Sequence, residues 1–139
     1  MNWMHFMATF CAGLFTGTAV FVAVVQHSAA TQLGYETYAK YFSLFYWRAA
    51  LMQVSLALIT VILGLVAWFY GAGFFNLIGA LIFIALILYS VIYIKPIDDQ
   101  LRAAKTEMPT DPESLLTRWG ALHRLRAGGA ALGFLFFLL

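Results

Sequence analysis

The chain has 139 residues, of which 63% are hydrophobic and 10% are charged, and its mean hydropathy is +0.87. Soluble domains carry about 25% charged residues, so this composition excludes an ordinary soluble domain and indicates a single membrane-embedded domain over residues 1–139. A net charge of +2 with no dense basic run excludes a typical nucleic-acid-binding protein, and the single cysteine, Cys11, excludes an internal disulfide or a CxxC motif.

Four apolar segments are each long enough to cross a bilayer, which takes about 20 residues of helix. They are expected near residues 4–27, 45–70, 73–94 and 115–138. The first segment has no Lys or Arg ahead of its apolar run, so it lacks the basic region of a signal peptide and is expected to remain as a helix. The predicted fold class is therefore all-α, an integral membrane four-helix bundle in up-down-up-down order.

The first two connections between these segments differ in composition. A polar and aromatic loop is expected from Ala29 to about Tyr41. Gly71-Ala72-Gly73 is expected to be a tight turn that makes the second and third segments an antiparallel hairpin.

The third connection, residues 95–114, is the most hydrophilic stretch of the chain. Lys95-Pro96 is expected to end the third helix, because proline disfavours helix at the residue before it and cannot donate a backbone hydrogen bond. The stretch closes on Thr110-Asp111-Pro112-Glu113. Either Thr110 caps the last helix with Glu113 reaching back, or Asp111 caps it with Pro112 in the first helical position.

The distribution of positive charge predicts an orientation. All eight Lys and Arg residues lie in, or beside, the connections that follow the first and third segments. The positive-inside rule then places these connections in the cytoplasm and both termini outside, in a bacterial-type inner membrane with lipids around the bundle.

Residues 118–126 carry four ionisable side chains into the last apolar segment. Each costs roughly 2.5–3.5 kcal/mol inside a bilayer on insertion scales, so a compensating role is expected. On a helical wheel, Trp119, His123, Arg126 and Ala130 share one face, whereas the two other arginines point elsewhere and can snorkel to the headgroups. The alternative is an interfacial helix end that carries positive-inside arginines.

Small residues suggest how the first and last segments pack. They contain the pairs Gly13-x-x-x-Gly17 and Gly129-x-x-x-Gly133, a pattern that lets membrane helices approach closely. If the two pairs meet in antiparallel packing, His27 falls level with Trp119, about one turn from His123. Alternatively, the glycines pack other helices or mediate a homo-oligomer, and His27 lies among the headgroups.

Two histidines and one arginine are the candidate catalytic residues. His123 and His27 are candidate bases, since an unperturbed imidazole pKa of about 6.5 suits proton transfer near neutrality. Arg126 is a candidate partner for an oxyanion or an anionic head group. The alternative for each is a structural role at a helix end.

Besides Trp119, the candidate substrate-binding residues lie outside the last segment. Arg48, beside Tyr46, either contacts a ligand or belongs to an aromatic belt at the membrane interface. Asp98 either forms a surface ion pair with Arg102, four residues on, or folds back to orient His123 or Arg126.

A cofactor is not expected. His27, His123 and Asp98 could form a two-histidine-one-carboxylate site for a metal, and a histidine could ligate haem. The sequence contains none of the local spacings that usually accompany such sites, including HxxH, HExxH and CxxC.

The ordering of these motifs resembles the anthrone oxygenase-like family of small four-helix membrane proteins, much of which is known only as a domain of unknown function. The resemblance rests on the glycine-containing first helix, on Tyr46-Trp47-Arg48, on the turn Lys95-Pro96-Ile97-Asp98-Asp99-Gln100-Leu101, and on the run from Trp119 through His123 to Arg126. The chain differs from the family pattern at Asp98 and His123, where asparagine is common.

The resemblance implies oxidation of an anthrone to an anthraquinone by dioxygen, without a cofactor. It then implies His123 or His27 as the base and Arg126, with Arg48, as the oxyanion partner. Trp119 and the aromatic residues Tyr41, Phe45 and Tyr46 would stack on a flat, hydrophobic small-molecule ligand. The pocket for this ligand is expected to open at the cytoplasmic interface between the first and last helices. The alternatives to an enzyme are a non-catalytic lipid-binding or accessory membrane protein, a small transporter, and a haem or metal redox protein.

Overall fold

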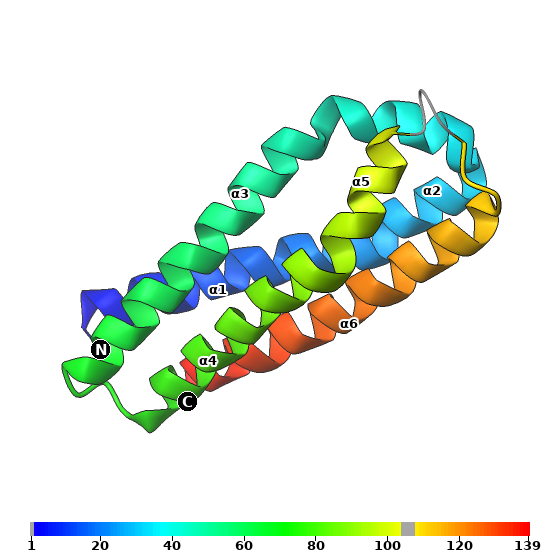
Figure 1. Ribbon diagram of the computed structural model, residues 1–139. Coiled ribbons are helices and arrows are strands. Elements are labelled where there is room, and N and C mark those ends of the chain that lie inside the picture. The colour runs from blue at the N-terminus through cyan, green and yellow to red at the C-terminus, as the bar shows by residue number, and fades with distance from the viewer. Residues whose placement is uncertain (1, 104–107) are drawn as a thin grey trace.

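The computed structural model describes residues 2–103 and 108–139, and every regular element in these ranges is helical, as predicted. The elements are α1 (Trp3–Phe21), a π-helical turn (Val22–Gln26), α2 (His27–Leu33), α3 (Tyr35–Phe69), α4 (Phe74–Tyr89), a second π-helical turn (Ser90–Ile94), α5 (Lys95–Ala103) and α6 (Pro112–Leu138). Both termini and the turn between α3 and α4 lie at one end of the bundle, here the turn-side end (Figure 1). The α2–α3 junction, the end of α5 and the start of α6 lie at the other, the loop-side end.

Within residues 2–103 and 108–139, three helical stretches are long and apolar enough to cross a membrane. They are Trp3–Leu33, Tyr35–Phe69 and Phe74–Ala103, and they correspond to the first three predicted segments. The helix α6 is not among them, and its first half carries His123 and two arginines. The helices therefore mark the chain as an integral membrane protein.

The predicted loop from Ala29 to Tyr41 is wrong, because helix occupies nearly all of it. Only Gly34 interrupts the helix, with a φ of +81° that favours glycine, and α3 begins at the next residue. Tyr35, Tyr38 and Phe42 follow helical spacing and are buried, so this segment packs as an amphipathic helix.

The predicted helix end before Pro96 is also wrong, because the chain continues from α4 through α5 without a break. The π-helical turn that precedes Pro96 accounts for the difference. Its closing N–H, on Lys95, donates to the carbonyl of Ser90, five residues back. This wider turn relieves the clash that a proline ring makes with the carbonyl four residues earlier in a regular α-helix.

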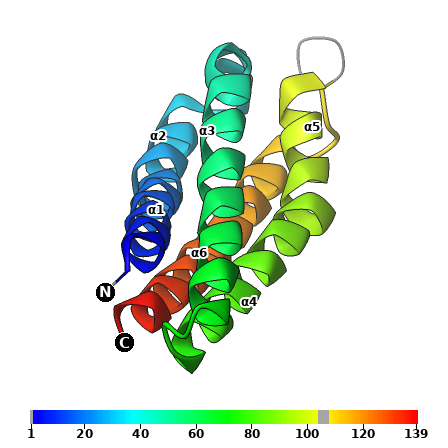
Figure 2. The ribbon, with the colours of Figure 1, turned by 90° about the vertical axis from the view of Figure 1, so that its left-hand side faces the viewer.

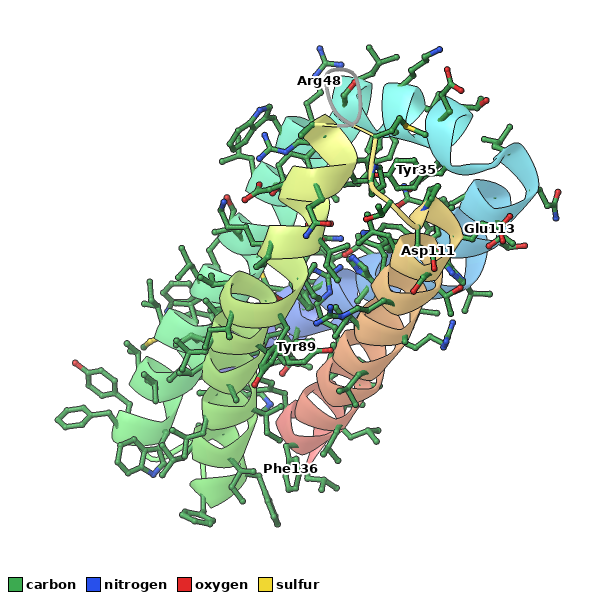
Figure 3. All side chains as sticks on the ribbon, turned by 45° about the vertical axis from the view of Figure 1, so that its right-hand side comes forward. Tyr35, Arg48, Tyr89, Asp111, Glu113 and Phe136 are labelled. Carbon is green, nitrogen blue, oxygen red and sulfur yellow. The ribbon has the colours of Figure 1, made fainter. Side chains whose placement is uncertain are left out.

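The predicted tight turn and one of the two predicted caps are present. Gly71 and Gly73 have φ angles of +86° and +98° between α3 and α4. At the start of α6, the Asp111 side chain accepts a hydrogen bond of 3.1 Å from the Ser114 N–H, and Pro112 follows the cap. The second alternative for this helix start is therefore confirmed (Figure 3).

The predicted contact between the two glycine pairs is wrong, although α1 and α6 do pack together. Gly129 and Gly133 face Leu86 and Phe83 of α4, whose side chains occupy the space that a Cβ atom would need. The contact between α1 and α6 instead includes Thr16, whose hydroxyl donates to the Ala130 carbonyl at 3.1 Å. The small residues of α6 thus serve packing within the chain.

Candidate functional site

The face of α6 predicted from the helical wheel is buried as a unit. Trp119, His123 and Arg126 are 1%, 4% and 6% exposed, and Ala130 is fully buried. The neighbouring residues Arg118 and Arg124 are exposed, as expected of side chains that point away from this face. An imidazole and a guanidinium group therefore lie inside the bundle.

A cavity of about 330 Å³ lies against this face of α6. Its walls come mainly from α3 on one side and from α4, the second π-helical turn and α5 on the other. Figure 2 shows α6 behind the space between α3 and α5. The polar side chains that line the cavity are those of Gln26, Gln53, Ser90, Lys95, Asp98, His123 and Arg126, and the aromatic ones are those of Phe15, Phe42, Phe45, Tyr46, Trp47 and Trp119. The expected opening between the first and last helices is therefore displaced toward α3 and α5.

His123 presents its ring to this cavity without a hydrogen bond. Its two ring nitrogens are buried and have no hydrogen-bond partner among the described residues. The ring packs on Trp119 at a centroid distance of 4.5 Å, and its Nε2 atom lies 4.0 Å from Oδ1 of Asp98, beyond hydrogen-bonding distance. Such a ring retains its capacity to exchange a proton with a ligand.

Arg126, one turn further along α6, is in a similar position. Its Nε and Nη2 atoms are buried and have no hydrogen-bond partner within residues 2–103 and 108–139. The guanidinium carbon lies 5.8 Å from the ring centre of Phe15. Burying a charged group without hydrogen-bond partners costs free energy. A ligand whose oxygen accepts hydrogen bonds from Arg126 would remove this cost, and its binding would be favoured for that reason.

Asp98 does fold back into the bundle, but its hydrogen-bond partner is Trp119. The indole N–H donates to Oδ1 of Asp98 at 2.9 Å, which fixes the ring that supports His123. The predicted ion pair between Asp98 and Arg102 is wrong, because Arg102 bonds to Asp99 instead, at 2.5 Å. The carboxylate at position 98 is thereby left facing the cavity.

His27 lies beside the cavity but does not line it. Its Nε2 atom is 3.2 Å from the Leu116 carbonyl oxygen. Its ring centre is 6.1 Å from that of Trp119, so the prediction that His27 lies level with Trp119 is confirmed. The imidazole occupies the space that a Cβ atom on Gly120 would need. A glycine at this position is therefore what lets α2 and α6 approach.

The two predicted binding residues on α3 have different positions. Tyr46 lines the cavity, whereas Arg48 is exposed and does not (Figure 3). Of the other aromatic residues expected to stack on a ligand, Phe45 lines the cavity and Tyr41 is 60% exposed outside it.

Sequence reasoning did not name four polar residues of the cavity as site residues, Gln26, Gln53, Ser90 and Lys95. Gln26 and Ser90 belong to the two π-helical turns, and such turns are frequent at functional sites. Isolated polar residues inside apolar segments were the available signal. The turns themselves have no recognisable sequence pattern.

The candidate metal ligands do not form a site. Among the described residues, no group of three His, Cys, Asp or Glu side chains is arranged to hold a metal ion. His27 in particular is turned toward the Leu116 carbonyl.

The fold and the site together define a helical membrane protein with an imidazole and a guanidinium group in an apolar, ring-lined cavity. The family model described as anthrone oxygenase matches residues 41–136, and the chain belongs to this family. The matched range includes all the cavity residues of α3, α4, α5 and α6. No curated protein and no solved structure matches the chain.

Proposed function

We propose that this protein is a membrane-embedded, cofactor-independent oxygenase that oxidises an anthrone-like or quinone-like aromatic molecule in the cavity beside α6. The observation that carries the proposal is that His123 and Arg126 lie in the same cavity. Both are buried, and both line a cavity with mostly apolar walls. The two ring nitrogens of His123 and the Nε and Nη2 atoms of Arg126 have no hydrogen-bond partner among the described residues.

The reaction needs one base and one positive group in a dry site. His123 takes the acidic benzylic proton of the anthrone, and Arg126 stabilises the negative charge that develops on the carbonyl oxygen of the anthrone. The resulting anion gives one electron to dioxygen, and the two radicals combine into a carbon-bound peroxide that takes up the proton held by His123. Loss of the second benzylic proton and of hydroxide leaves the new carbonyl. Overall, one anthrone and one dioxygen give one anthraquinone and one water.

The remaining site residues position these two. Asp98 holds Trp119, and Trp119 supports the His123 ring. His27 packs between α2 and α6, outside the cavity lining, so we assign it a positioning role. Tyr46 and Phe45 supply flat surfaces for the ligand.

The proposed membrane arrangement has four spans. The helix α6, from Pro112 to Leu138, has 27 residues, which corresponds to about 40 Å at 1.5 Å per residue and is enough to cross a bilayer. Its buried ionisable side chains, those of His123 and Arg126, face the bundle interior, where ionisable residues of membrane helices are usually found. We place the loop-side end in the cytoplasm and both termini outside, in a bacterial-type inner membrane. We place a homo-oligomer contact at Gly17, where a Cβ atom would meet no neighbour within the chain.

Oxygen consumption by the protein in lipid vesicles tests the proposal. The substrate is anthrone, and the rate in protein-free vesicles is subtracted to remove spontaneous oxidation. His123→Ala and Arg126→Met should each lower the rate about 100-fold or more. His5→Ala is the matched control, because His5 bonds to Asn76 at the turn-side end and should leave the rate unchanged. Unchanged rates in both cavity variants would refute the assignment.

A further inference from the structure

At the loop-side end of the cavity, side chains of α5 pack on side chains of α3. The guanidinium carbon of Arg102 lies 4.2 Å from the ring centre of Tyr46 and 4.8 Å from that of Trp47. Its Nη2 atom bonds to Asp99, which fixes the guanidinium group over both rings. Leu101, the residue before Arg102, is fully buried. These contacts hold α5 against α3 at this end.

The flank of the cavity between α3 and the second π-helical turn is open. Val54 and Val91 both line the cavity, yet they are 54% and 57% exposed. Next to Val54, the α3 wall of the cavity includes the small residues Ala50 and Ala57. The cavity thus has an exposed rim at mid-helix.

Both sides of this rim belong to helical stretches that are long and apolar enough to cross a membrane. Val54 belongs to the candidate span Tyr35–Phe69, and Val91 belongs to the candidate span Phe74–Ala103. Both side chains are apolar, so water gains nothing by entering between them. A molecule dissolved in the bilayer reaches the cavity here without crossing a polar surface.

We infer that the flank between Val54 and Val91 is a lateral portal, through which a flat ring molecule that carries an acceptor oxygen passes from the bilayer into the cavity. The inference rests on the proposed function for the class of ligand. Aromatic rings partition into the bilayer, and the unpartnered Nε and Nη2 atoms of Arg126 provide the donors for the oxygen. A lipid acyl chain would match the apolar walls but would leave Arg126 unpaired.

The test is the binding kinetics of anthraquinone to the native protein in lipid nanodiscs, followed by its own absorbance. The double variant with Val54→Phe and Val91→Phe narrows the portal with large apolar side chains. The matched control is Ile62→Phe with Leu88→Phe, on the same two helices. These residues are equally exposed, but they do not line the cavity.

A portal acts on rates and leaves the equilibrium nearly unchanged. The portal variant should slow both association and dissociation about tenfold and leave Kd within about twofold, whereas the control variant should match the native protein. Association at the native rate in the portal variant would overturn the inference. So would a change confined to dissociation, which would indicate a wall contact, or a failure of anthraquinone to bind the native protein.

Entry from the loop-side end would have a different signature. Arg102→Ala removes the stack on Tyr46 and Trp47 and would then speed association, whereas a lateral portal predicts an unchanged rate. Oxygen consumption is measured separately on the same samples. If anthraquinone binds the portal variant more slowly but the native protein takes up no oxygen, the portal stands and the proposed oxygenase is refuted. If the native protein takes up oxygen but the portal variant binds at the native rate, the oxygenase stands and the portal is refuted.

Discussion

Gly120→Ala tests the packing of α2 against α6 that positions the site. The His27 imidazole occupies the volume of the missing Cβ atom, so an alanine forces the ring to leave. The displaced ring loses its 3.2 Å hydrogen bond to the Leu116 carbonyl, which contributes about 1 kcal/mol. The added methyl group in a packed contact costs a further 1–3 kcal/mol, roughly.

The control is Gly128→Ala, on the same helix. A Cβ atom at Gly128 meets no neighbour within 4 Å, so this change brings only the gain in helix propensity of about 1 kcal/mol. The same gain applies at Gly120 and cancels in the comparison. The free energy of unfolding of the Gly120→Ala variant should therefore lie about 2–4 kcal/mol below that of the Gly128→Ala variant.

The assay is reversible unfolding in mixed micelles, followed by circular dichroism as denaturing detergent is added. The Gly120→Ala substitution is then made in a His27→Ala variant, which has no imidazole ring to displace. In that variant, Gly120→Ala should cause little loss in the free energy of unfolding. Equal stability of the two glycine variants in the native background would refute the packing described for His27.

Two further predictions concern the buried polar groups. Arg126→Met should raise the free energy of unfolding by about 1–4 kcal/mol, because it replaces a buried charge without a hydrogen-bond partner among the described residues by an apolar chain of similar length. The same detergent titration measures this, and a destabilised variant would show that Arg126 is paired in the resting protein. Asp98→Ala should cost about 1–3 kcal/mol, because it leaves the buried Trp119 indole N–H without its acceptor. In a variant that already carries Trp119→Phe, Asp98→Ala should cost little further stability, because the indole N–H is gone. If the two substitutions instead lower the free energy of unfolding additively, the hydrogen bond between Asp98 and Trp119 is contradicted.

The site on α6 could be predicted from the sequence because its geometry is local. Trp119, His123 and Arg126 lie within one helix, and their spacing alone places them on one face. Burial of that face could be expected because exposing ionisable side chains of an apolar segment to lipid costs free energy. The cap at Asp111 was equally accessible, since capping depends on a few adjacent residues.

What the sequence did not reveal depends on backbone irregularity and on distant contacts. Pro96 indicated a helix end, but the π-helical turn before it carries the helix onward and places Asp98 next to Trp119. The fit of His27 against Gly120 joins residues far apart in the chain, and only the tertiary packing brings them together. The same holds for the cavity, whose walls come from α3 and from the irregular turn at Ser90.

The most direct test of the account is an absorption spectrum of anthrone bound to the protein in lipid nanodiscs, recorded without oxygen at neutral pH. With no dioxygen to react, a base and a guanidinium group in a dry cavity should hold the bound molecule as its anion, which absorbs at longer wavelength than the neutral form. The native protein should show the band of the anion, and both His123→Ala and Arg126→Met should show only neutral anthrone. A native spectrum that contains only the neutral form would contradict the central claim that His123 and Arg126 act together on a ligand in this cavity.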